Sequence, residues 1–150
     1  MTSASRDRNG AGRPQQARPR DATGRPLPYG DPRGVEPVPE VALPPADSLT
    51  LAQELLDAGR AFSAHEVLEA AWKAAPAEER DLWQGLAQVC VGLTHAQRGN
   101  AAGAARLLQR GVARLRPFAA APPYGIDVAG ILAWYAHNPA APLPRLRSPK

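Results

Sequence analysis

The chain has 150 residues, enough for one modest domain, and its single cysteine excludes both an internal disulfide and a zinc site built on several cysteines. The formal net charge is +4. Between Met1 and Asp47, seven cations stand against six acids, a surplus too small for a nucleic-acid-binding arm.

The composition divides the chain into three parts. Nine of the seventeen prolines fall within residues 1–47, where no periodic apolar face can form. We therefore expect residues 1–47 to be a disordered Pro/Arg-rich tail, residues 48–138 to be a single helical domain, and residues 139–150 to be a flexible Pro-rich tail. No apolar run suits a signal peptide or a membrane span, so we expect a cytoplasmic protein without a membrane partner.

The first two helices are expected at about residues 49–58 and 63–75. Asp47 or Ser48 would cap the first helix, and Gly59 would end it. A capping box would start the second: the Ser63 hydroxyl would accept the backbone N–H of Glu66, and the Glu66 carboxylate would reach back.

A third helix is expected at about residues 77–98. It carries no charged residue from Leu82 to Gln97, which predicts a position at the buried centre of the domain and a buried, structural thiol at Cys90. Gly99 would end this helix, and Asn100 would cap a fourth at residues 101–115. Asp127 would cap a fifth, which runs to about residue 137.

An internal repeat relates the helices at a spacing of 40 residues. Gly59 aligns with Gly99, and Leu68 with Leu108. Small residues followed by a large aliphatic residue are typical of tetratricopeptide-type helix pairs. We therefore predict an all-α fold: a compact bundle of about five helices, built from two tetratricopeptide-like helical hairpins plus a closing helix.

Five polar residues lie on faces of the second and third helices that we expect to be mostly buried. An unsatisfied buried amide or imidazole costs roughly 1–3 kcal/mol, so we expect these side chains to converge between the two helices. The candidate site consists of His65, Glu69, Gln84, Gln88 and His95.

Three interpretations of this polar cluster remain open. It could be a hydrogen-bond network that fixes the register of two helices, or the lining of a small pocket for a polar ligand. It could also be a metal site with His65, Glu69 and His95 as ligands. We favour the network. No nucleophile is evident, so no catalytic residue is assigned and no cofactor is expected.

Arginines recur along one side of the fourth helix, at Arg106, Arg110 and Arg114, and Arg98 lies just before its start. They could meet phosphate, but a solvated helix face explains them more simply. That helix carries no aromatic residue on which a base could stack, so we do not expect a nucleic-acid partner.

The sequence resembles an uncharacterised prokaryotic family, the domain-of-unknown-function family numbered three hundred and nine. The stretches "AHEVLEAAW", "QGLAQVCVGLTHAQRGNAAGAARLL" and "YGID" carry the resemblance, in the family's order, between about residues 51 and 132. It implies a small all-α fold and no established activity. The motif positions correspond here to His65, Glu66, Glu69, Trp72, Gln84, Gly85, His95, Arg98, Gly99, Asn100, Gly103 and Ala104.

The sequence leaves two classes of function open. We expect a non-enzymatic cytosolic helical module that binds a protein or peptide partner. The alternative is a small-molecule- or metal-binding protein, or a hydrolase-type enzyme, centred on His65, Glu69 and His95. Apolar helix faces could also close a homodimer.

Overall fold

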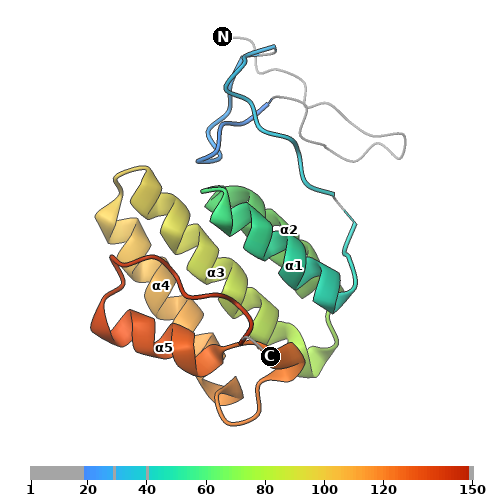
Figure 1. Ribbon diagram of the computed structural model, residues 1–150, viewed down its shortest axis with the longest axis vertical. Helices are drawn as coiled ribbons and strands as arrows, with labels where there is room; N and C mark the ends of the chain where they lie inside the picture. The colour runs from blue at the N-terminus through green and yellow to red at the C-terminus, as the bar shows by residue number, and fades with distance from the viewer. Residues whose placement is uncertain (1–18, 29, 40, 149–150) are drawn as a thin grey trace.

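The computed structural model describes residues 19–28, 30–39 and 41–148 (Figure 1). Over these residues it contains five α-helices and three short 3-10 turns, and its only β pairing is in isolated bridges. The predicted all-α class is therefore confirmed. The helices are α1 (Pro45–Asp57), α2 (Ala61–Ala74), α3 (Arg80–Gln97), α4 (Ala101–Leu115) and α5 (Val128–His137).

The third helix is the centre of the domain, as the sequence predicted. It packs against α2 on one side and α4 on the other, while α1 covers α2 and α5 lies against α4 (Figure 1). Its residues Leu82, Trp83 and Leu86 are almost completely buried. Cys90 is also buried, and burial raises the pKa of its thiol to about 12, which fits a structural role.

Glycines allow α3 and α4 to approach closely. A Cβ at Gly111 would lie 2.8 Å from the backbone oxygen of Gly85, and a Cβ at Gly92 would lie 2.8 Å from the side chain of Leu108. Because backbone cannot yield as a flexible side chain does, Gly111 is needed at this helix crossing.

The two hairpins end their first helices with the same backbone turn. Gly59 (φ 75°) and Gly99 (φ 78°) both adopt the left-handed conformation that glycine accepts most readily. The following N–H groups, of Arg60 and Asn100, each bond the carbonyl five residues earlier at 2.8 Å. The 40-residue repeat thus corresponds to repeated local geometry. The likeness to tetratricopeptide hairpins stays a prediction.

The first helix starts earlier than predicted. It begins at Pro45, with Pro44 as N-cap, because proline at the first helical position loses no intrahelical hydrogen bond. Asp47 and Ser48 lie in the first turn and do not cap it. The Ser48 side chain is buried and donates to the carbonyl of Leu43 at 3.1 Å.

The predicted capping box at the second helix is wrong. Helix α2 begins at Ala61, and its N-cap residue Arg60 makes no side-chain cap. Ser63 therefore lies inside the first turn, buried, with its hydroxyl 3.2 Å from the Arg60 guanidinium. The caps predicted at the other two helices are confirmed, because Asn100 and Asp127 each accept a backbone N–H at 3.0 Å.

The N-terminal segment contacts the end of the bundle where α2 begins and α3 ends (Figure 1). Leu27 is buried, the Arg98 side chain donates to the carbonyl of Thr23 at 2.9 Å, and Gly24 lies against the ring of Phe62. Residues 19–28 and 30–39 thus make specific contacts where a disordered tail was expected. For residues 1–18, that prediction lies outside the described residues.

Candidate functional site

His65 and Glu69 form a pair on one helix. The His65 Nε2 atom lies 2.8 Å from Glu69 Oε2, and Lys73 lies 3.1 Å from the other oxygen of Glu69. Burial lowers the pKa of His65, and the neighbouring carboxylate offsets part of that shift. Both residues belong to the predicted polar cluster, and both lie on α2.

Gln88 contacts α4 and not α2. Its side-chain oxygen accepts a hydrogen bond at 3.1 Å from Arg114, whose guanidinium also lies 2.6 Å from Asp81. Gln84, one turn earlier on α3, is half-buried on the same side of the helix. Arg114 therefore ties α4 to two residues of α3.

His95 lies at the turn between α3 and α4. Its Nδ1 atom accepts a hydrogen bond at 3.1 Å from the amide of Asn100, whose oxygen caps α4. No group of three or more His, Cys, Asp or Glu side chains in the described part of the chain could hold a metal ion. The convergence of His65, Glu69 and His95 predicted from the sequence does not occur.

The prediction failed because a helical wheel assigns a residue to a face without naming the neighbour that this face meets. Helix α3 has two neighbours, α2 and α4. Its polar residues lie along the border with α4, close to Gly85 and its crossing with Gly111. The polar stripe of α2 faces elsewhere, so the two stripes do not meet.

The predicted basic face is not uniform either. Arg98 bonds Thr23 and stacks over Phe62 at 5.8 Å, and Arg114 bonds Gln88 and Asp81. Arg106 and Arg110 are exposed, and no ion pair with another described residue engages them. Only these two present open charge on α4.

Residues 139–148, named here the C-terminal arm, form the site that the sequence did not predict. The arm runs back from the end of α5 across the helices (Figure 1), and it packs where a flexible tail was expected. Leu146 is 2% exposed and belongs to the hydrophobic core. Burial of a leucine contributes roughly 1.5–3 kcal/mol, enough to hold a short segment in place.

The backbone of the arm is held on both sides of Leu146. Its N–H donates to the side-chain oxygen of Gln53 on α1 at 2.8 Å, and its carbonyl accepts the N–H of Asp127 at 2.7 Å. Ser148 donates to the carbonyl of Gly125 at 2.9 Å. Arg147 and Ile126 pair as an isolated antiparallel bridge.

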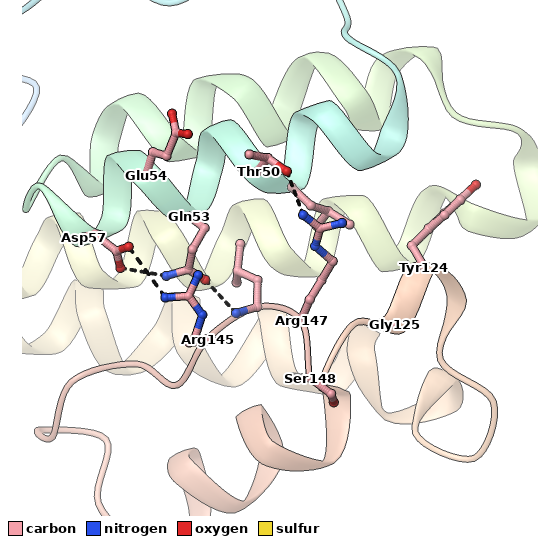
Figure 2. Close-up of a pocket in the computed structure, with 11 residues that line it drawn as sticks. Thr50, Gln53, Glu54, Asp57, Tyr124, Gly125, Arg145, Arg147 and Ser148 are labelled. Carbon is pink, nitrogen blue, oxygen red and sulfur yellow. Dashed lines mark hydrogen bonds and ion pairs between the residues drawn. The ribbon is translucent and has the colours of Figure 1, made fainter. Parts of the chain in front are cut away.

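Helix α1 meets the arm with polar and acidic side chains (Figure 2). Asp57 accepts the Gln53 amide N–H at 2.8 Å, which orients the Gln53 oxygen toward the arm. Arg147 donates to the hydroxyl of Thr50 at 2.6 Å, and Arg145 lies 3.7 Å from Asp57.

The arm fills the surrounding space incompletely. We name the surface of α1 and residues 124–127 on which the arm lies the α1 groove. Beside the arm, an open cavity of about 610 Å³ remains. Figure 2 shows its lining residues: Leu49, Thr50, Gln53, Glu54, Asp57, Tyr124, Gly125, Arg145, Leu146, Arg147 and Ser148. A second cavity, about 720 Å³, lies beneath residues 139–144 beside Leu56 and Leu93.

Tyr124 forms one wall of the α1 groove. It has a φ of 58°, unusual for a residue other than glycine, and its hydroxyl donates to Glu79 at 2.7 Å. That hydrogen bond raises the pKa of Tyr124. The same Glu79 oxygen accepts the indole N–H of the buried Trp83 at 3.1 Å, so this wall is fixed to α3.

One sequence signal could have revealed the arm. Leu143 and Leu146 are aliphatic residues within an otherwise polar and Pro-rich stretch, "PLPRLRS". A disordered tail has no need of large aliphatic residues at such spacing. Two aliphatic residues are nevertheless too few to define a period, so the pattern alone could not show where they pack.

The fold and the groove define a small all-helical domain whose surface holds an extended chain segment. Residues 49–107 match the model of the family described as "Domain of unknown function (DUF309)", which confirms the resemblance over these residues. This matched segment contains Thr50, Gln53 and Asp57 of the groove, and the arm lies outside it.

A curated relative also matches. The uncharacterized protein YpuF of Bacillus subtilis (strain 168) is 42% identical over 52 residues, which are 34% of this chain and 30% of the relative. The chain therefore matches less than a third of the relative's length. No solved structure matches the chain. No helix among the described residues is long and apolar enough to cross a lipid bilayer.

Proposed function

We propose that this protein is a non-enzymatic helical module that binds an extended segment of a partner protein or peptide in the α1 groove. The supporting observation is the docking of the C-terminal arm, which already lies there as an extended chain. Its N–H and carbonyl at Leu146 are both bonded, by Gln53 and by Asp127.

The contacts have the properties of peptide recognition. Main-chain hydrogen bonds hold a segment of any sequence, and pockets for individual side chains select among sequences. Here the main-chain bonds come from Gln53, Gly125 and Asp127. The selective pocket is the one that buries Leu146. Unfilled volume beside the arm leaves space for a longer or bulkier ligand.

The alternative enzyme or metal-binding function gains no support from the positions of its residues. His65 and Glu69 pair with each other, and His95 bonds Asn100 at the α3–α4 turn. A site for chemistry needs its groups within reach of one reacting atom. The proposed compartment is the cytosol, where a free thiol such as that of Cys90 is usual.

A peptide titration tests the proposal. A fluorescent peptide with the sequence of residues 139–148 would be titrated with the full chain and followed by anisotropy. The titrated chains carry Leu146→Asp, which releases the chain's own arm from the groove. We expect saturable binding that the addition of Gln53→Ala weakens, because it removes the acceptor for the main-chain N–H of the peptide. The matched control is Gln97→Ala, which alters a glutamine bonded to Gly59 instead. Equal binding by the two variants would sink the proposal.

A homodimer is a second candidate, and the same contacts favour it. A second copy carries an identical arm, and a Pro-rich connection such as residues 139–144 can pass an arm from one copy to another. Light scattering across a concentration series would measure this: a dimer that Leu146→Asp dissolves supports arm exchange, and a monomer at every concentration excludes it.

A further inference from the structure

We propose that the C-terminal arm is an internal competitor for the α1 groove, displaced by a partner segment with the same chemistry: an extended strand carrying a leucine between two basic residues. This inference rests on the proposed function and adds the partner class and the regulation of the site.

The partner chemistry follows from what holds the arm. Leu146 is buried, and the residues on either side of it are Arg145 and Arg147. These arginines meet Asp57 and Thr50; Glu54 also lines the groove, with its carboxylate directed away from the arm (Figure 2). Acidic side chains on one rim favour a basic ligand. A partner segment that satisfied all of these contacts would therefore place a leucine in the pocket and a basic residue on each side.

The exchange is feasible because the charged contacts are weak. The Arg145 side chain is 67% exposed and that of Asp57 is 57% exposed, so their pairing at 3.7 Å stabilises docking little. Burial of Leu146 and two main-chain bonds account for most of the attachment. A partner segment would replace each of these contacts in kind, so displacement leaves no buried polar group unpaired.

Tethering gives the arm its advantage over a free segment. A short flexible linker holds its end at an effective concentration on the order of millimolar, so a free ligand competes at a disadvantage. The connection from Asn138 to Arg145 is short, and Ala141 is fixed by the indole of Trp134 at 2.8 Å. A variant that loosens the arm, with the groove unchanged, should therefore bind a free segment more tightly.

The test compares full-length chains that differ in how tightly the C-terminal arm binds the α1 groove. The probe is a fluorescent peptide with the sequence of residues 139–148. Arg145→Glu with Arg147→Glu loosens the arm by repulsion from Asp57 and by loss of the Arg147–Thr50 hydrogen bond. Arg106→Glu with Arg110→Glu makes the same change in net charge on α4, away from the groove. A third chain, Leu146→Asp, displaces the arm through its anchor, and circular dichroism verifies that every chain is helical.

We expect the arm variant to bind the probe about tenfold more tightly than the unaltered chain, and the α4 variant to bind within about twofold of it. Addition of Gln53→Ala to the arm variant should remove most of the gain. Equal tightening in the arm and α4 variants would show a general charge effect and overturn the competitor. Equal binding by all chains would overturn the competitor and leave the proposed function standing. Absence of saturable binding to every folded chain would overturn both.

Discussion

The side-chain oxygen of Gln53 accepts the backbone N–H of Leu146 at 2.8 Å, and this bond joins positions 93 residues apart in the chain. The orientation of the Gln53 amide is set by Asp57, which accepts its N–H at 2.8 Å. One helical turn of α1 thus presents a fixed acceptor to an extended chain. The proposed binding of an extended segment depends on this relationship.

Replacement of Gln53 by alanine should free the Leu146 amide. Its hydrogen exchange, measured by NMR on the full chain, should accelerate because its hydrogen-bond acceptor is gone, and the free energy of unfolding should fall by about 0.5–1.5 kcal/mol. Gln97→Ala should leave the Leu146 amide unchanged. An unaltered exchange rate in Gln53→Ala would mean that Gln53 does not hold the arm.

Truncation of Leu146 to alanine should destabilise the domain by about 2–5 kcal/mol, because this side chain belongs to the core. Leu143→Ala, in a half-buried side chain of the same arm, is the matched control and should cost clearly less. Urea unfolding measures both. Equal losses, or no loss at Leu146, would contradict the burial of the arm.

Protonation of His65 should destabilise the folded protein. Burial lowers its pKa below the ordinary 6.5, so the unfolded state binds the proton first as the pH falls. The stability contributed by neutral His65 is complete above pH 6.5 and declines as the pH falls toward the pKa of the folded state. An NMR titration of the imidazole should give a midpoint below 6.5, and a midpoint above 6.5 would contradict this.

Glu66 gives the stability a second pH dependence, because burial raises its pKa above 4.5. Two variants separate this dependence from that of His65. Glu66 contributes stability below pH 4.5 that declines as the pH rises through its folded-state pKa, so its slope is opposite. His65→Gln should flatten the rise in stability toward pH 6.5, and Glu66→Gln should steepen it. Thermal melts at several pH values measure both slopes.

Substitution of Gly24 by alanine should detach the N-terminal segment. A Cβ there would overlap the ring of Phe62, which also lies beneath the guanidinium groups of Arg20 and Arg98. The matched control is Gly30→Ala, which has a similar positive φ but no atom within 4 Å of the added Cβ. Faster tryptic cleavage after Arg20, which precedes Asp21, in Gly24→Ala alone is the expected result; equal cleavage in both variants would exclude a packing role.

The sequence predicted the helices well wherever local chemistry decides. The interval from Asn100 to Leu115 matched in full, because a capping asparagine and a glycine stop lie at its start. The predicted start of α2 was wrong, because Ser63 and Glu66 have the spacing of a capping box, yet Ser63 already lies in the first turn of the helix. Sequence spacing cannot distinguish a cap from a first turn when the preceding residues also accept helical geometry.

The groove could not be predicted, because it depends on contacts distant in the sequence. The burial of α3 was predicted correctly from its uncharged stretch, as buried Leu82 and Leu86 show. Which border residues meet was not determined, so Gln88 was placed near His65 when it contacts Arg114. The arm was missed for the same reason, because the partners of Leu146 lie on α1 and next to α5.

The most direct test of the α1 groove is amide exchange with a competing peptide present. Unlabelled peptide with the sequence of residues 139–148 is added to the isotope-labelled full chain, and two amides are followed. The Leu146 amide should exchange faster, because the arm leaves. The Asp127 amide should stay protected, because the peptide supplies a carbonyl in place of that of Leu146. If the peptide binds and the Leu146 amide keeps its protection, the α1 groove is not the binding site.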